Sequence, residues 1–140
     1  MKKRCLAFLL ALSLVTAFCA VPVFALEERA SKTLTSYLGV MKAGNKSGEL
    51  RISYEVYAND YADSVGVSSI ALYNSQGVYM TTILGSTDNG LIEENDFSCI
   101  GTYSHTAVSG NSYYASITVF AKIGDDYDSR KIVTSTVTAP

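Results

Sequence analysis

Residues 110–122 read Gly-Asn-Ser-Tyr-Tyr-Ala-Ser-Ile-Thr-Val-Phe-Ala-Lys, a turn signal followed by ten residues that alternate strictly in character. The mainly apolar alternate positions are Tyr113, Ala115, Ile117, Val119 and Ala121. A period of two is the repeat of a β-strand, in which successive side chains point to opposite faces. This stretch therefore predicts a strand with one apolar face against a core and one face of mixed polar and apolar side chains.

The same pattern recurs along the chain. In residues 49–58 the predicted inward side chains are Leu50, Ile52, Tyr54, Val56 and Ala58. Other strands are predicted at residues 32–42, with Leu34, Leu38 and Val40 on one face, and at 65–73, 78–84, 97–107 and 130–138. Turns or loops are predicted at residues 43–48, 59–64, 74–77, 85–96 and 123–129, the fourth being the longest. About seven strands with no helical stretch predict an all-β antiparallel sandwich.

The sandwich is expected to be immunoglobulin-like. Tyr113 follows directly on the turn Gly110-Asn111-Ser112 and opens the penultimate strand, which is where the tyrosine corner of such domains lies. The paired cysteines and core tryptophan of antibody domains are missing, and Ala115 stands where their second cysteine would be.

The N-terminus has the three parts of a secretory signal peptide. Met1-Lys2-Lys3-Arg4 precedes an apolar run from Cys5 to Ala20, and Val23-x-Ala25 offers small residues for cleavage. We expect cleavage after Ala25 and a secreted protein. An uncleaved anchor is the minor alternative, because the apolar run is short for a spanning helix and Pro22 interrupts it. Residues 26–31 are expected to be a flexible lead-in and residues 32–140 a single domain.

Composition excludes several classes of partner. Removal of Lys2, Lys3 and Arg4 would reduce the 11 basic residues to 8, against 13 acidic ones. A mildly acidic surface without a basic cluster argues against nucleic acid and anionic lipid. Cys99 would be the only cysteine left, so no internal disulfide is expected, which suits an exported Gram-positive protein.

The sequence offers few combinations of residues that could form a catalytic site. A thiol nucleophile with a histidine base would need Cys99 and His105, which lie about 20 Å apart if they share a strand. No serine stands in a Gly-x-Ser-x-Gly context, and a serine triad would also depend on His105. Cys99 is therefore expected to be a small buried residue, His105 a rim residue, and the protein no enzyme. No cofactor is expected.

Acidic residues cluster in the predicted loops. Three of them, Asp125, Asp126 and Asp128, form the best short candidate for a calcium site, because Ca²⁺ takes oxygen ligands, although their spacing matches no established calcium loop. A small hydrolase using the loop acids Glu93, Glu94 and Asp96 stays open as an alternative, since glycosidases need two carboxylates in a cleft.

Outward aromatic residues are the remaining signal. By the alternation they are Tyr57, Tyr114 and Phe120, with Tyr73 expected beside Tyr114 on a neighbouring strand. Aromatic rings on a sheet face can bind sugars or anchor a protein partner. Cross-strand pairs of such rings also stabilise a sheet without any ligand.

The mature chain resembles a family of small exported proteins of unknown function from Gram-positive anaerobic bacteria. The resemblance rests on the signal peptide and on residues 50–56, 65–73 and 110–115, and covers nearly all of residues 30–140. It implies a fold but transfers no catalytic residue.

The sequence thus predicts a secreted, disulfide-free sandwich that acts as a non-enzymatic binding or interaction module for an extracellular glycan or protein. An assembling surface or matrix protein that uses exposed edge strands is the second hypothesis.

Overall fold

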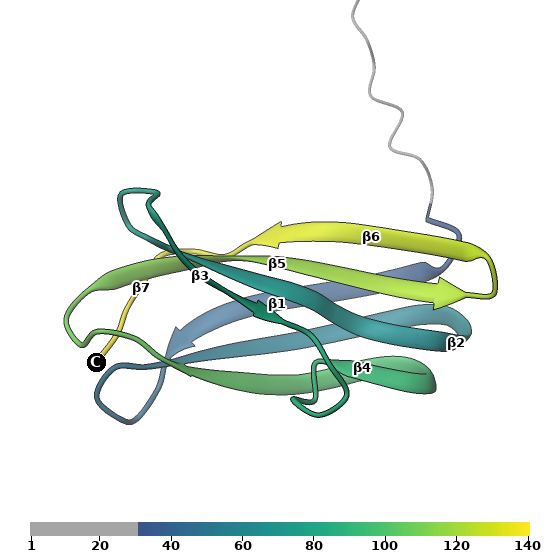
Figure 1. The fold of residues 1–140 in the computed structure, drawn as a ribbon, viewed down its shortest axis with the longest axis horizontal. Helices are drawn as coiled ribbons and strands as arrows, with labels where there is room; N and C mark the ends of the chain where they lie inside the picture. Colours follow the sequence, from purple (N-terminus) through teal and green to yellow (C-terminus); the bar gives the residue numbers. More distant parts are fainter. Residues whose placement is uncertain (1–30) are drawn as a thin grey trace, which may run out of the picture.

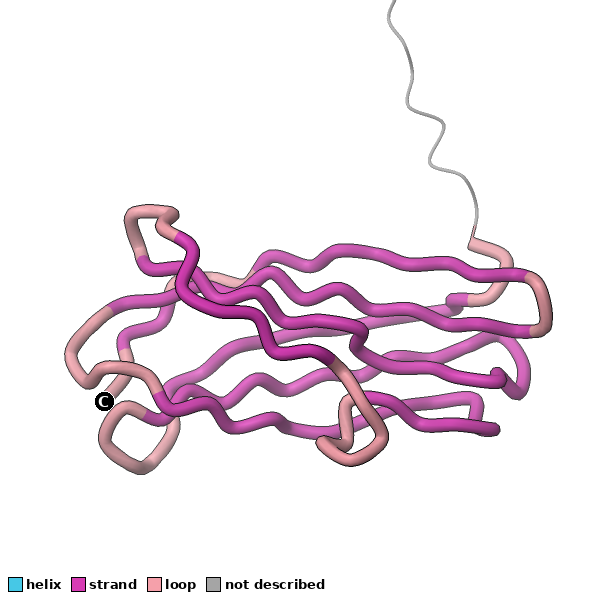
Figure 2. Tube along the Cα trace, in the orientation of Figure 1, coloured by secondary structure: helices cyan, strands magenta, loops and turns pink. Residues whose placement is uncertain are grey.

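Seven antiparallel β-strands and no helix make up the described part of the chain, residues 31–140 of a computed structural model (Figures 1 and 2). The strands are β1 (Leu34–Ala43), β2 (Glu49–Asn74), β3 (Tyr79–Leu84), β4 (Ile92–Thr106), β5 (Ser112–Ile123), β6 (Asp126–Val133) and β7 (Val137–Thr138). The all-β antiparallel prediction is confirmed. The predicted signal peptide, residues 1–25, lies outside the described residues. Within residues 31–140 there is no helix with the length and apolar character needed to cross a membrane.

β2 connects the strands into one sheet. Its first half pairs with β1 on one side and β4 on the other, and its second half pairs with β5 on one side and with β3 and the start of β4 on the other. β6 and the short β7 pair with β5. The predicted sandwich of two separate sheets is therefore not seen: a single hydrogen-bonded sheet curls into a half-barrel (Figure 1).

The curl is made where β2 doubles back on itself, at the end of the molecule opposite the C-terminus (Figure 1). The prediction of a loop at residues 59–64 is wrong, because strand geometry continues through them. The register against β4 shifts between Tyr57 and Ala62, so that residues 58–61 lie opposite Phe97 alone. Extra residues on one strand of a pair form a bulge that bends the strand, and polar turn-forming residues are well suited to that position.

Two other predicted boundaries need correction. The irregular connection predicted at residues 85–96 ends at Leu91, and β4 begins at Ile92, so Glu93, Glu94 and Asp96 lie on a strand. The strand predicted at residues 130–138 is β6 and β7, separated by residues 134–136, and β6 begins earlier, at Asp126. Both places are rich in charged residues, which are common in turns, yet the backbone there pairs with a neighbouring strand.

The core fills the inside of the curl. The predicted inward faces of residues 49–58 and 113–121 are confirmed, because every one of these apolar alternate residues is buried. The Tyr113 hydroxyl accepts the backbone N–H of Val108, five residues upstream, at 3.2 Å. In β1 the buried side chains are Leu34 and Met41, whereas Leu38 is exposed and Val40 half-buried, because a bulge between Leu34 and Ser36 shifts the alternation.

Glycines permit two close approaches inside the curl. At Gly39 of β1 an added Cβ would lie 2.8 Å from the Ile117 side chain of β5, so the absence of a side chain lets β1 pack against β5. At Gly66 of β2 the backbone has a φ of +147°, and an added Cβ would lie 2.1 Å from the backbone oxygen of Leu91. That oxygen accepts the N–H of Val67 at 2.7 Å, so the loop before β4 is bonded to β2 at this point.

We predict that Gly66→Ala lowers the free energy of unfolding by about 3 kcal/mol or more, because it adds a steric clash with backbone to an unfavourable φ. Gly110→Ala is the matched control: its φ is +82° but an added Cβ meets nothing within 4 Å, so only about 1 kcal/mol is expected. Urea unfolding curves measure both values. Equal losses at the two positions would show that the Leu91 contact does not constrain the fold.

Candidate functional site

The four predicted binding residues do not form one patch. Tyr57 lies on the first half of β2, whereas Tyr73 lies on its second half, in a different part of the curled sheet. Phe120 is only 6% exposed and stacks against Tyr127 of β6. Only Tyr73 and Tyr114 come together, as opposite residues of the β2–β5 pair.

Tyr73 and Tyr114 belong to a row of three tyrosines on the outer face. Their ring centroids are 5.2 Å apart and the rings are nearly parallel, at 11°. Tyr79 of β3 extends the row on the other side of Tyr73, edge to face at 5.9 Å. Tyr79 is 57% exposed, and the other two are half-buried. We call Tyr79, Tyr73 and Tyr114 the tyrosine row.

The hairpin between β2 and β3 creates this row. Asn74 forms the turn: its side-chain oxygen accepts the backbone N–H of Gln76 at 3.0 Å and that of Val78 at 2.9 Å. Gly77 has a φ of +82°, which a glycine adopts at low cost. The tight turn places Tyr79 opposite Tyr73. The predicted hairpin at residues 74–77 also implies that Tyr79 lies near Tyr73, so the third ring of the row has a signal in the sequence.

The surface around the tyrosine row is uncharged. No Asp, Glu, Lys or Arg occurs from Val65 to Thr87, or from Phe97 to Ala121. The residues beside the row on the outer face, one step along the strands, are Thr82, Ala71 and Ser116, which the strand register sets opposite one another. The Tyr79 hydroxyl lies 3.1 Å from the Thr82 hydroxyl. The site thus combines aromatic rings with hydroxyl groups and has no formal charge.

A depression of about 470 Å³ lies at the open side of the half-barrel, between β3 and the end of β4. Apolar side chains line most of it: Leu72, Met80, Ala107, Val108 and Tyr113. His105 is its one titratable imidazole, and burial lowers the pKa of that group, so the ring is neutral at pH 7. No Asp, Glu, Lys or Arg lines this depression. The predicted rim position of His105 agrees with its half-buried place there.

Cys99 is a buried core residue, as predicted. Its side chain is 1% exposed, and its sulfur lies 3.4 Å from the backbone oxygen of Leu91. Burial, assisted by the nearby charge of Glu93, raises the pKa of the thiol from 9.0 to about 11. Cys99 and His105 share β4 and are six residues apart, so they cannot form a thiol–imidazole pair.

We predict that the Cys99 thiol of the folded protein does not react with a disulfide reagent such as DTNB at pH 8 over the time in which the urea-unfolded chain reacts fully. Both burial and the raised pKa suppress the thiolate that the reaction needs. The absorbance of the released thionitrobenzoate measures the rate. A native rate within a few fold of the unfolded rate would contradict the burial of Cys99.

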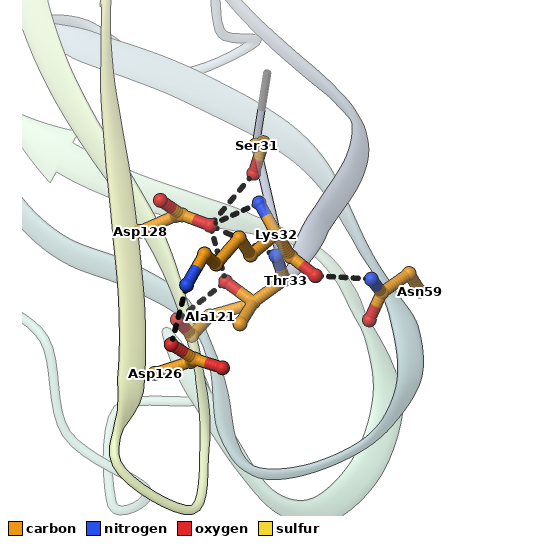
Figure 3. Close-up of polar contacts among 7 residues, drawn as sticks. All are labelled: Ser31, Lys32, Thr33, Asn59, Ala121, Asp126 and Asp128. Carbon is orange, nitrogen blue, oxygen red and sulfur yellow. Dashed lines mark hydrogen bonds and ion pairs between the residues drawn. The ribbon is translucent and has the colours of Figure 1, made fainter. Parts of the chain in front are cut away.

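Asp128, one of the three acids of the calcium hypothesis, holds the start of the domain (Figure 3). One of its oxygens, Oδ2, accepts the backbone N–H of Lys32 at 2.6 Å and of Thr33 at 2.8 Å. The same oxygen lies 3.0 Å from each of the hydroxyls of Ser31 and Thr33. These bonds lower the pKa of the Asp128 carboxyl group, the N–H of Thr33 contributing most.

The other acids do not complete a metal site. Asp126 forms an exposed ion pair with Lys32 at 3.4 Å (Figure 3), and Asp125 is exposed in the turn before β6. Within residues 31–140 no three Asp, Glu, His or Cys side chains gather as metal ligands. The geometry therefore gives Asp128 a structural role and offers no support for calcium. Glu93 and Glu94 are exposed on β4, and none of the four surface depressions described for this part of the chain is lined by two carboxylates.

We predict that Asp128→Asn costs about 1 kcal/mol of unfolding free energy at pH 7, because these partly buried bonds lose the carboxylate charge but keep an acceptor. The folded-state pKa is lowered from the ordinary 3.8. The stabilisation that the ionised carboxylate provides is therefore complete above the ordinary pKa, and it is lost as the pH falls through the lower pKa of the folded protein. The difference between the two proteins should shrink below about pH 4 in urea unfolding series.

Asp125→Asn is the control for this series and should change stability by less than about 0.5 kcal/mol at any pH. A gap between wild type and Asp128→Asn that stays constant from pH 7 to pH 3 would contradict the role given to the Asp128 carboxylate.

Comparison with known proteins identifies no family. Neither the models of protein families nor the curated proteins contain a match to this sequence. Among solved structures, a family 76 glycoside hydrolase from a bovine Bacteroides thetaiotaomicron strain matches with a TM-score of 0.43 and 18% sequence identity. The match covers 75% of this chain and 20% of that chain. The chain thus spans a fifth of that enzyme, and a likeness at this level supports no conclusion about fold or function.

Proposed function

We propose that this protein is an exported, non-enzymatic binding module that recognises a neutral glycan through the tyrosine row. The observation that carries the proposal is the alignment of Tyr79, Tyr73 and Tyr114 across three neighbouring strands on an uncharged face. Export rests on the signal peptide predicted for residues 1–25. The predicted immunoglobulin-like relationship and the resemblance to small exported proteins belong to the same proposal, and the Tyr113 contact with Val108 supports the former.

A glycan suits the chemistry of this surface. Sugar rings have apolar faces that can pack on aromatic rings, and their hydroxyl groups match the Thr82 and Ser116 hydroxyls beside the row. A neutral ligand is favoured because an anionic or cationic one would find no counter-charge between Val65 and Thr87. None of the three tyrosines lines any of the four depressions named above, and the row lies on a face of the sheet. A flat face suits an extended polymer better than a small molecule, which needs a concave site.

The competing explanation is structural: the three rings could simply stabilise the sheet by cross-strand pairing, a contribution of about 0.2–1 kcal/mol per pair. The two explanations differ in what a substitution changes. Loss of sheet pairing alters stability only, whereas loss of a binding surface alters affinity at temperatures where the protein stays folded.

We predict that Tyr79→Ala and Tyr114→Ala each weaken binding to neutral polysaccharides by about tenfold, because each removes a ring from the contact surface. The measurement is a glycan array followed by affinity electrophoresis in gels that contain the polysaccharides bound on the array. Circular dichroism melts of the same variants establish that they are folded.

The matched control is Tyr61→Ala. Tyr61 is also an exposed tyrosine in an edge-to-face pair, with Phe97 at 5.8 Å, but it lies at the bend of β2, away from the row. It should leave glycan binding unchanged. No bound glycan on the array, or an equal loss with Tyr61→Ala, would overturn the proposal, as would binding only to a protein partner on the cell surface.

A further inference from the structure

We propose that β3 is a dimerisation edge, which pairs antiparallel with β3 of a second copy of this chain about a two-fold axis at Thr82. The resulting contact would join the sheets of two copies side by side. The argument rests on the backbone groups that β3 leaves free, on the absence of charge along it, and on the match between the strand and its own two-fold image.

β3 has one free edge. It pairs with β2 alone, and β4, which lies on the same side of β2, pairs with β2 and not with β3. Gly85 donates its backbone N–H to the carbonyl oxygen of Ser68 of β2 at 2.9 Å, and this bond shows which residues of β3 face β2. In an antiparallel ladder bonded and non-bonded residues alternate. The N–H and C=O groups of Thr82 and the N–H of Leu84 therefore point away from β2, toward the free edge. The C=O of Leu84 points the same way but already accepts the side-chain amide of Asn89 at 2.8 Å.

The edge lacks the features by which proteins prevent strands from pairing. Edge strands are usually protected by charged side chains, prolines or a covering segment. β3 lies in the uncharged stretch from Val65 to Thr87, which has no proline. Three of its six side chains are large, mainly apolar and open to solvent: Leu84 is 72% exposed, Tyr79 57% and Met80 48%. The edge strand β6, by contrast, carries Asp126, Asp128, Arg130 and Lys131.

The strand matches its own image in one register. A two-fold axis perpendicular to the sheet pairs inward-facing residues of one copy with inward-facing residues of the other. Because side chains alternate between the faces, the two residues of each pair must both have odd numbers or both have even numbers. Centring on Thr82 pairs Thr82 with itself, Thr81 with Ile83, and Leu84 with Met80. This register joins the free N–H and C=O groups of Thr82 in a reciprocal pair of hydrogen bonds. It also brings the exposed Leu84 beside the backbone of Met80 of the second copy, which removes part of the Leu84 side chain from water. Met80 itself lies at a register shift of the β2–β3 pair, and its side chain lines the depression with Leu72 and Tyr113.

A second copy fits this edge better than an unrelated strand. Self-pairing of an uncharged strand involves no like-charge repulsion, and the two-fold contact is closed, so it stops at a dimer. The outer face with the tyrosine row remains open in such a dimer, because the contact runs along the strand edge. The inference therefore does not depend on glycan binding, and each can fail without the other.

The test is sedimentation velocity of the purified protein from about 1 μM to 1 mM, with charged variants at the axis. The wild type should show a concentration-dependent monomer–dimer equilibrium. Thr82→Lys and Thr82→Glu place two like charges directly opposite each other and should each raise the dimer dissociation constant at least about tenfold. An equimolar mixture of the two variants should restore the dimer, because opposite charges then meet. Misfolding of either variant could not produce that rescue.

Thr102→Lys is the control, an exposed threonine on the outer face of β4, and should dimerise like the wild type. Purely monomeric wild type at 1 mM would overturn the proposal. So would a Thr82→Lys variant that dimerises normally, a mixture without rescue, or open-ended assemblies larger than a dimer, which would assign the contact to another edge. Monomeric wild type that still binds glycans in a Tyr114-dependent way would overturn the dimer and leave the proposed function intact.

Discussion

Hydrogen bonding along β2 is the constraint on which the rest of the structure depends. Residues 50–57 have β1 on one side and β4 on the other, and residues 69–73 have β3 and β5. Each half of one strand is thus the centre of a three-stranded unit, and the bend at residues 58–61 folds one unit over the other. Buried backbone groups must be paired, and this arrangement pairs them on both sides without a disulfide or a metal ion among the described residues.

The same constraint determines where function can lie. The inside of the curl is filled by the core, so its residues have no access to a ligand. What remains are the outer faces, the free edges and the open side between β3 and β4. The tyrosine row and the β3 edge both depend on the hairpin that returns the chain from β2 to β3. The second half of β2 therefore supports both proposed surfaces, the binding face and the association edge, while in its first half buried core residues alternate with more exposed ones.

The alternation of apolar and polar residues predicted most of the strands, but it predicted little of how the sheet curls on itself. The inward residues of 49–58 and 113–121, the Asn74–Gly77 hairpin and the burial of Cys99 followed from residue type and period. The bend of β2 did not, because Asn59, Asp60 and Asp63 favour a loop by composition while long-range pairing keeps them in a strand. For the site, Tyr73 and Tyr114 were paired correctly. Phe120 was misjudged because its burial under Tyr127 depends on a neighbouring strand, and Tyr57 because the bend separates the two halves of β2.

Native-state hydrogen exchange tests the central role of β2 most directly. If both halves are parts of one cooperative sheet, amides of Ile52 and Ile70 should exchange only through global unfolding, with equal free energies and equal dependence on denaturant. The amides of Thr82 and Leu84, which face the free edge, should exchange much faster in dilute protein. Separate opening of the second half of β2 at a lower free energy than the first would contradict a single sheet organised by this strand.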